Sequence, residues 1–585
     1  TEFGGMNEIF VDLYADTGDV RWLNLSYKFE HESFIEPLQR HQDNLDGKHG
    51  NTQVPKLLGS LDRYAYTGLA GDIMAAGFFW DRVVQHHSYA TGGHGRDEYF
   101  GPADVLGDRV DGRTAETCNV YNMLKLTRRL FAFRPDALYA DFHERALFNH
   151  ILASIDPNDG RTCYMVPVGR GVQHEYADMF DSFTCCVGSG MESHALHADG
   201  IYYESGDKLY INLYAPSTAE WTAMGAKLTV ETDFPEGESV TIKLTVPSPK
   251  EFALAVRRPY WVGDGFAVTV NGQAVSQEGG RRTEDRGRPG QAPKTGSFVE
   301  IERTWNTGDT VEIALPKTLR LEPTPDNPQR VAILWGPLVL AGDMGPEREF
   351  GRRGPRNEPT IPVFVAAERP VAEWLKPLQG QAGCFRTDGV CRATDAENVA
   401  DVNFVPFYRL HRRSYAIYWD LFTQAGWDQK KAEYAAEQER QRKLKEATVA
   451  YAQPGEMQPE RDFNYQAGEG ASLQRIQGRP GRRATGWFSF DLPVEDAHPM
   501  TLVVTYFSDE RRRGQAIFEI LVDGRRVAEQ AVERSSPARF FDVEYALAAD
   551  LVKGKQKVTV RFQATPGNEV ATVFGIRTIR ADAER

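Results

Sequence analysis

Long apolar runs are absent from this chain of 585 residues, cysteines are scarce, and basic side chains are fewer than acidic ones. No stretch of about 18 apolar residues exists, so the sequence predicts no helix that crosses a membrane. The 68 basic residues are outnumbered by 82 acidic ones; the net charge of -14 argues against a nucleic-acid partner. Six cysteines in so long a chain do not make a disulfide framework.

No signal peptide is visible in this sequence. The chain starts at Thr1 inside a helical pattern, with no basic segment followed by an apolar one. Because this start resembles a cut within a helical domain, the sequence leaves the cellular compartment open. It gives no indication of the oligomeric state.

The length exceeds what one core can fill, and the patterns predict a multidomain α + β chain. Residues 1–205 have helical spacing, and the turn Y-A-D-T-G at Tyr14–Gly18 returns as Y-A-Y-T-G at Tyr64–Gly68. A looser copy ends a third helix at residues 131–135. Hairpins with like turns indicate an α/α barrel, here a partial one, because about seven helices precede the first strands and a closed six-hairpin barrel has twelve.

From about residue 206 the apolar period changes to two, which predicts a β-sandwich over residues 206–345. Its last strand pair is expected at residues 330–342, and residues 279–296 are predicted to form a charged, mobile loop. Residues 346–460 form a mixed connector with two strands and a charged helix at Gln429–Tyr451. Residues 461–585 are predicted to form a C-terminal β-sandwich that either binds carbohydrate or packs against its neighbours.

Thiols and a carboxylate gather in two short stretches. R-T-A-E-T-C-N-V-Y-N holds Glu116 and Cys118 at the start of a helix, and S-F-T-C-C-V-G-S-G-M-E-S holds Cys185 and Cys186. Three thiolates and one carboxylate make one tetrahedral zinc shell. Buried, inert cysteines are the alternative interpretation, which the residues alone leave open.

A Gly-rich loop, T-G-G-H-G-R-D-E-Y-F-G, lies just before the first of these stretches and carries Glu98 between aromatic residues. A carboxyl group in apolar surroundings has a raised pKa and can act as a proton donor, whereas a solvated loop carboxylate cannot. His49, His94 and Tyr164 are candidates for binding sugar hydroxyls. For each of them a purely structural role is the alternative.

In order along the chain, G-K-H-G-N-T-Q, T-G-G-H-G-R-D-E-Y-F-G-P, D-G-R-T-A-E-T-C-N-V-Y-N-M-L-K-L-T and S-F-T-C-C-V-G-S-G-M-E-S resemble the zinc-dependent β-L-arabinofuranosidases of glycoside hydrolase families 127 and 146. The residues of the first and third motifs are closer to those of family 146. The resemblance covers about residues 1–345 and continues more weakly to about residue 420. It implies an (α/α)6-type barrel, here without its N-terminal part, followed by β-sandwich domains.

The resemblance also implies roles. Zinc would be held by Glu116, Cys118, Cys185 and Cys186; Cys185 would be the nucleophile and Glu98 the general acid/base. His49 would match a sugar-contacting histidine and Tyr164, less closely, a sugar-contacting tyrosine. His94 remains a candidate for sugar binding from its own Gly-rich motif.

The expected function is that of a bacterial retaining glycosidase releasing L-arabinose from β-L-arabinofuranosides of plant-type glycans. Two alternatives stand beside it: a zinc-stabilised carbohydrate-binding protein without turnover, and an α/α-barrel hydrolase whose zinc is purely structural. The natural glycan and its linkage are not indicated by the sequence.

Overall fold

The computed structural model describes residues 3–263, 265–275, 296–348, 350–351, 354–355, 361–393, 399–476, 479–508, 516–535 and 538–581. The chain divides into two compact units, Thr1–Trp427 and Asp428–Arg585. None of the described helices is apolar over a length that could cross a membrane. The loop predicted at residues 279–296 falls, except for its last residue, outside the described residues.

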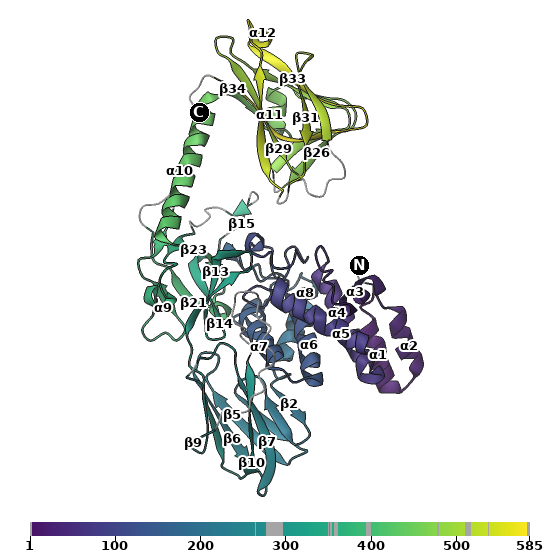
Figure 1. The fold of residues 1–585 in the computed structure, drawn as a ribbon, viewed down its shortest axis with the longest axis vertical. Coiled ribbons are helices and arrows are strands. Elements are labelled where there is room, and N and C mark those ends of the chain that lie inside the picture. The colour runs from purple at the N-terminus through teal and green to yellow at the C-terminus, as the bar shows by residue number, and fades with distance from the viewer. Residues whose placement is uncertain are drawn as a thin grey trace. The chain divides into compact units, whose positions relative to one another are not determined.

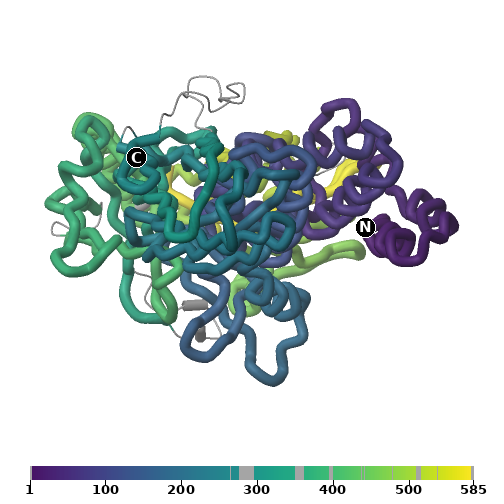
Figure 2. Tube along the Cα trace, turned by 90° about the horizontal axis from the view of Figure 1, so that it is seen from below, coloured from purple at the N-terminus to yellow at the C-terminus, as the bar shows by residue number. Residues whose placement is uncertain are grey.

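A layer of α-helices occupies one side of the first unit (Figure 1), and its N-terminal hairpin lies at the outer edge of that layer (Figure 2). The helices of this layer are α1 (Asn7–Thr17), α2 (Val20–Lys28), α3 (Glu32–Gln39), α4 (Gly50–Thr67), α5 (Ala70–Arg82), α6 (Thr117–Phe133), α7 (Ala137–Ala146) and α8 (Cys185–Ala195). The predicted combination of a helical domain with β domains is confirmed.

The repeated turns end two of these helices in the same way. Gly18 and Gly68 have left-handed φ angles of 70° and 65°, and their amides donate to the carbonyls of Tyr14 and Tyr64 at 2.8 and 2.9 Å. Glycine adopts this conformation without steric cost, so each Thr-Gly pair stops one helix and turns the chain into the next.

The sequence predicted only helices up to about residue 200, but this region also contains a strand. Strand β1 (Arg170–Gln173) precedes α8 and pairs with β22 (Arg413–Ala416), more than 200 residues later. The short sequence R-G-V-Q has no alternation of its own, because its partner strand supplies the hydrogen bonds.

Two sheets follow the helices and share one apolar core, as a β-sandwich does. The four-stranded sheet has the order β10-β7-β3-β2 and the six-stranded sheet the order β4-β5-β6-β11-β8-β9. The strands are β2 (Tyr202–Ser205), β3 (Lys208–Ile211), β4 (Ser217–Trp221), β5 (Ala226–Thr232), β6 (Ser239–Thr245), β7 (Lys250–Arg258), β8 (Ala267–Val270), β9 (Gln273–Ala274), β10 (Ser297–Trp305) and β11 (Thr310–Ala314).

An eleven-stranded sheet completes the first unit. It contains β1, β12 (Leu319–Thr324), β13 (Asn327–Trp335), β14 (Leu338–Pro346), β17 (Val363–Val365), β18 (Leu375–Pro377), β19 (Phe385–Thr387), β20 (Cys391–Arg392), β21 (Asn403–Pro406), β22 and β23 (Tyr418–Phe422). Residues 330–342 were predicted to close the preceding sandwich. They form strands, but β13 pairs with β23 and β14 with β21, so the sheet extends across the predicted boundary at residue 345.

The second unit is a further β-sandwich, whose two sheets share a second apolar core. Its elements are β24 (Thr448–Ala452), α11 (Met457–Asp462), β25 (Gln466–Ala467), β26 (Ala471–Ile476), β27 (Arg479–Ala484), β28 (Trp487–Pro493), β29 (Met500–Phe507), β30 (Ala516–Val522), β31 (Arg525–Val532), β32 (Phe540–Leu547), α12 (Ala549–Val552), β33 (Lys557–Ala564) and β34 (Val570–Arg580). The charged helix α10 runs over Gln424–Ala447 and not to Tyr451, because Thr448–Ala452 pairs with β34.

Buried histidines in the first unit predict a marked loss of stability in mild acid. His94, His150 and His174 are at most 2% exposed, and burial lowers the pKa of each to about 3. The unfolded chain binds these protons below about pH 6.5 and the folded chain does not, so stability falls as the pH decreases from 6.5 towards 3. About 2 kcal/mol per histidine should be lost between pH 6.5 and pH 5.

Urea unfolding at pH 7 and pH 5 measures this loss. His150→Gln should remove about 2 kcal/mol of this pH dependence, while His41→Gln, at an exposed position, should leave it unchanged. An equal pH dependence in His150→Gln and the unmodified chain would show that His150 does not contribute.

Candidate active site

Glu98 lies at the tip of a tightly held loop. Asp97 and Glu98 have left-handed φ angles of 53° and 70°, which are uncommon for residues other than glycine. Three backbone hydrogen bonds fix the loop: Asp97 N–H to the Arg113 carbonyl at 2.9 Å, Gly50 N–H to the Glu98 carbonyl at 2.7 Å, and Tyr99 N–H to the Arg96 carbonyl at 3.0 Å. Strained backbone of this kind is often retained where it aims a functional side chain.

The Glu98 carboxylate is held from both sides. His49, the residue before α4, places Nε2 2.7 Å from Oε2, and the Tyr164 hydroxyl donates to Oε1 at 2.5 Å. The His49 ring packs edge-on against Tyr99, with ring centroids 5.2 Å apart. The Glu98 side chain stays 29% exposed, so a ligand can reach the carboxylate.

Glu116 and Cys118 converge because the helix begins between them. Glu116 is the N-cap of α6 and has extended backbone angles, whereas Cys118 is already helical. Hydrogen bonds fix the start of α6 to the segment that carries Tyr164. The Thr117 N–H donates to the Tyr164 carbonyl at 2.9 Å, and the Thr117 hydroxyl donates to the Cys163 carbonyl at 2.8 Å. Side chains two residues apart diverge on a regular helix. Here the helix begins between Glu116 and Cys118, so both side chains point to one place.

Cys185 and Cys186 are the first two residues of α8, after the N-cap Thr184. The Cys186 sulfur lies 3.3 Å from that of Cys118, and both Cys185 and Cys186 sulfurs lie 3.8 Å from Glu116 Oε1. A helix N-terminus favours negative charge, which suits thiolates at this position.

The pKa values of the four cluster side chains are shifted by burial, by hydrogen bonds and by the charges of their neighbours. Burial raises the pKa of Glu116 to about 8, with the charges of Cys118 and Glu98 adding to it. The hydrogen bond from the Cys186 thiol lowers the pKa of Cys118 to about 6 and raises the pKa of Cys186. Burial raises the pKa of Cys185 to about 11, and the neighbouring Cys118 charge acts in the same direction. The four groups cannot all ionise together unless a cation compensates them.

The donor set fits a metal ion. One ligand atom from each of Glu116, Cys118, Cys185 and Cys186 lies within 4.8 Å of all the others. Zn–S bonds of about 2.3 Å and Zn–O bonds of about 2.1 Å give tetrahedron edges of about 3.6–3.8 Å, close to the 3.3 Å sulfur–sulfur and 3.8 Å sulfur–oxygen distances of the cluster. The second oxygen of Glu116 is buried without a hydrogen-bond partner among the described residues. The cluster could therefore bind a metal.

Tyr164 connects the two halves of the site. Its hydroxyl oxygen lies 2.5 Å from Glu98 Oε1 and 4.0 Å from the Cys185 sulfur. The carboxylate oxygen and the sulfur are therefore separated by about 6.5 Å at most. Burial and the hydrogen bond to Glu98 raise the pKa of Tyr164, so the phenol stays protonated and acts as a donor.

The structure does not bring His94 to this carboxylate. Its ring is fully buried, stacks on Phe100 with centroids 5.1 Å apart, and has no hydrogen-bond partner in the described part of the chain. Ser189 is a residue that the sequence analysis missed: its hydroxyl lies 3.0 Å from the Cys118 sulfur. The helical spacing of three residues from Cys186 was the signal that could have identified it.

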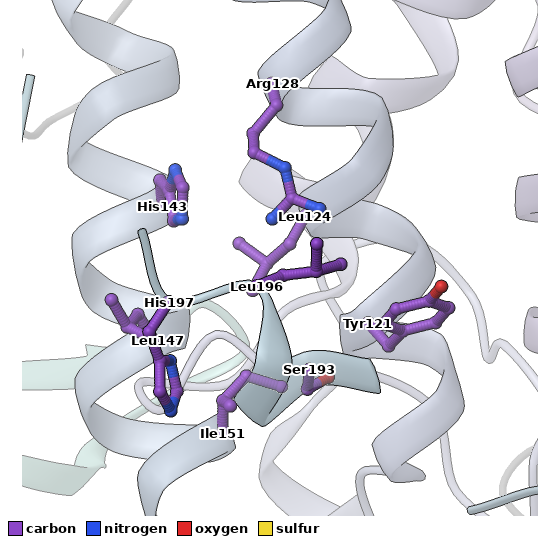
Figure 3. Close-up of a pocket in the computed structure, with 9 residues that line it drawn as sticks. All are labelled: Tyr121, Leu124, Arg128, His143, Leu147, Ile151, Ser193, Leu196 and His197. Atoms are coloured by element: carbon purple, nitrogen blue, oxygen red, sulfur yellow. The ribbon is translucent and has the colours of Figure 1, made fainter. Parts of the chain in front are cut away.

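A small cavity lies between α6, α7 and the C-terminal part of α8 (Figure 3). Tyr121, Leu124 and Arg128 of α6 face Ser193 and Leu196 across it. Its volume of about 10 Å³ has room for about one water molecule, so it is too small for a sugar.

Models of known domains match most of the chain. One described as the catalytic domain of GH127 β-L-arabinofuranosidases matches residues 1–199, and one described as the GH127 middle domain matches residues 208–317. Two models for domains of unknown function match residues 320–421 and 443–579.

A non-reducing end β-L-arabinofuranosidase from Bifidobacterium longum subsp. longum is 25% identical over 368 residues. The alignment covers 57% of this chain and 51% of that protein, so the chain spans about half the length of this curated relative.

Solved structures share the fold. One titled a glycoside hydrolase has a TM-score of 0.54 at 21% identity, and a GH127 β-L-arabinofuranosidase from Geobacillus stearothermophilus T6 has 0.53 at 20%. Both matches cover 71% of this chain, and they cover 74% and 71% of the other chains. The matched domain models define a protein of the glycoside hydrolase class. The chain belongs to glycoside hydrolase family 127.

The cluster predicts one equivalent of bound metal. Cys118→Ala should reduce bound zinc from about one equivalent to well below one tenth, because it removes a sulfur in contact with Cys186. Cys384→Ala, which changes a buried cysteine outside the cluster, should keep the full equivalent. Elemental analysis after dialysis measures both. Loss of zinc in Cys118→Ala together with full zinc in Cys186→Ala would contradict a shared site.

Proposed function

We propose that this chain is a retaining glycoside hydrolase that releases L-arabinose from β-L-arabinofuranosides of plant-type glycans. Cys185 is the nucleophile and Glu98 the general acid/base. The observation that carries this proposal is the Tyr164 hydroxyl, which contacts both groups and keeps them within about 6.5 Å of each other. Retaining enzymes with two carboxylates need a similar separation of about 5–5.5 Å.

The substrate class is taken from the relatives. The curated relative is named a non-reducing end β-L-arabinofuranosidase, and the matched catalytic-domain model carries the same activity in its description. A carbohydrate partner follows from the proposed reaction.

Glu116, Cys118, Cys185 and Cys186 would hold zinc, which when bound keeps its thiol ligands deprotonated. This supports Cys185 as a nucleophile at neutral pH. Cys185 is the exposed cysteine among the three cluster thiols, whereas Cys118 and Cys186 are 3% and 1% exposed.

In the first step the Cys185 sulfur attacks the anomeric carbon, and the bond from that carbon to the leaving oxygen breaks. Glu98 gives its proton to this oxygen. The Tyr164 hydroxyl and the His49 ring hold the Glu98 carboxyl group in place. Both side chains are also proposed to bind sugar hydroxyls, because their polar atoms face the same partly exposed carboxylate.

In the second step Glu98, now a carboxylate, removes a proton from water as the water oxygen attacks the same carbon. The carbon–sulfur bond breaks, the electron pair returns to Cys185, and arabinose leaves with its original anomeric configuration. Two inversions at one carbon give net retention.

Hydrolysis of p-nitrophenyl β-L-arabinofuranoside, followed by NMR of the first anomer released, tests the proposal. The β anomer should appear first, and the α-L-arabinofuranoside should react at least about 100-fold more slowly, because its leaving group points away from Glu98. Sugar binding without release of nitrophenol would favour a binding protein without turnover. Full activity in Cys185→Ser would favour a hydrolase with a structural metal.

A further inference from the structure

Three cysteine sulfurs meet in one cluster, yet the proposed reaction uses only one of them to attack the sugar. Cys118 and Cys186 are both buried, with their sulfur atoms 3.3 Å apart, and Cys185 is exposed. Burial explains why the substrate reaches Cys185 first. It does not explain what keeps the remaining sulfurs in place when the charge on Cys185 changes during the reaction.

Ser189 contacts one of these sulfurs directly. Its hydroxyl oxygen lies 3.0 Å from the Cys118 sulfur, and the side chain is almost completely buried. Against a thiolate the hydroxyl must be the donor, because the thiolate has no proton to give. A hydrogen bond to an ionised sulfur is stronger than one between neutral groups.

The helix explains why Ser189 is aimed at the cluster. Residues three, four and seven positions apart on α8 share one face, so Cys186, Ser189 and Ser193 all point towards α6. Figure 3 shows the continuation of this face, where Ser193 and Leu196 lie opposite α6 side chains. Ser189 is therefore the residue of this face that lies at the sulfurs, and Ser193 lies one turn further away.

We propose that Ser189 is a positioning residue of the metal centre: its hydroxyl donates to the Cys118 thiolate, keeps this sulfur as a permanent ligand and leaves Cys185 as the reactive sulfur. The inference rests on the proposed metal cluster. A hydrogen bond withdraws electron density from a thiolate, which makes that sulfur a poorer nucleophile and fixes its direction towards the metal.

The proposal is tested with cobalt(II) in place of zinc, because cobalt–thiolate charge-transfer bands report on the electron density of the sulfur. Ser189→Ala should shift these bands to longer wavelength and weaken cobalt affinity about 10- to 100-fold in a chelator competition. Ser189→Thr, which keeps the hydroxyl, should restore both values.

Ser193→Ala is the matched control, because Ser193 is about as buried on the same helix face but its hydroxyl forms no hydrogen bond to any of the four ligands. It should leave the bands unchanged and affinity within about 3-fold. Ser189→Ala with the original bands and affinity would overturn the role of Ser189. Equal losses of affinity in both alanine variants, with unchanged bands, would show a purely structural role. An unmodified chain that binds no cobalt would overturn the metal centre itself, and this inference with it.

Discussion

Cys185→Ala is expected to lower kcat/KM for p-nitrophenyl β-L-arabinofuranoside by roughly 10⁴- to 10⁶-fold, the order of the losses found when members of a catalytic triad are removed. Without this sulfur no covalent intermediate forms, and Glu98 alone can only assist direct attack by water. Cys384→Ala, outside the cluster, should retain full activity. A loss below about 10-fold in Cys185→Ala would rule out the nucleophile assignment.

The loss in Cys185→Ala has a second source, since Cys185 is also a proposed metal ligand. Covalent trapping separates the two roles. An epoxide or haloacetamide with the arabinofuranose configuration should label Cys185, whose side chain is exposed, and not Cys186, which is 1% exposed. Both cysteines would be thiolates on the same metal ion, so their charge does not decide which one is labelled. The exposure of each sulfur to the reagent does. Peptide mapping that finds the label on Cys186 would contradict the assignment.

Features of the fold that depend on neighbouring residues were predictable from the sequence. The helical hairpins followed from the repeated Thr-Gly stop, because a left-handed glycine ends a helix through its own backbone. The convergence of Glu116 and Cys118 followed from their place at a helix start, where the first residue keeps extended angles.

Features that depend on distant partners were not predictable. Strand β1 exists because Val172 pairs with Tyr415, and no local pattern in residues 170–173 indicates this. The eleven-stranded sheet likewise joins strands on both sides of the predicted domain boundary. Pairing energy between strands belongs to the tertiary contacts and leaves little trace in either strand alone.

The same distinction applies within the site. The sequence indicates which residue types could bind sugar, but burial decides which of them a ligand can reach. His49 and His94 are each followed directly by a glycine, yet His49 contacts Glu98 at 2.7 Å while His94 stacks on Phe100 with no exposed surface. This difference arises from the way the loop folds back over its own aromatic side chain.

Glu98→Gln is expected to separate substrates by their leaving groups. For an alkyl or sugar leaving group, which must be protonated as it departs, the rate of the first step should fall roughly 10²- to 10⁴-fold. For a dinitrophenolate, which departs without a proton, that step should fall less than about 10-fold. Pre-steady-state release of the phenol measures it, because the second step also needs the Glu98 carboxylate and will limit turnover.

Azide provides an independent test of the second step, since this anion attacks the intermediate without a general base. It should accelerate turnover of the dinitrophenyl substrate by Glu98→Gln and form an arabinosyl azide of retained configuration. Asp97→Asn is the matched control: Asp97 pairs with Arg113, and asparagine tolerates the left-handed backbone at this position. Activity there should stay within about 3-fold of the original. Equal losses on good and poor leaving groups in Glu98→Gln, with no effect of azide, would mean that Glu98 positions the sugar and transfers no proton.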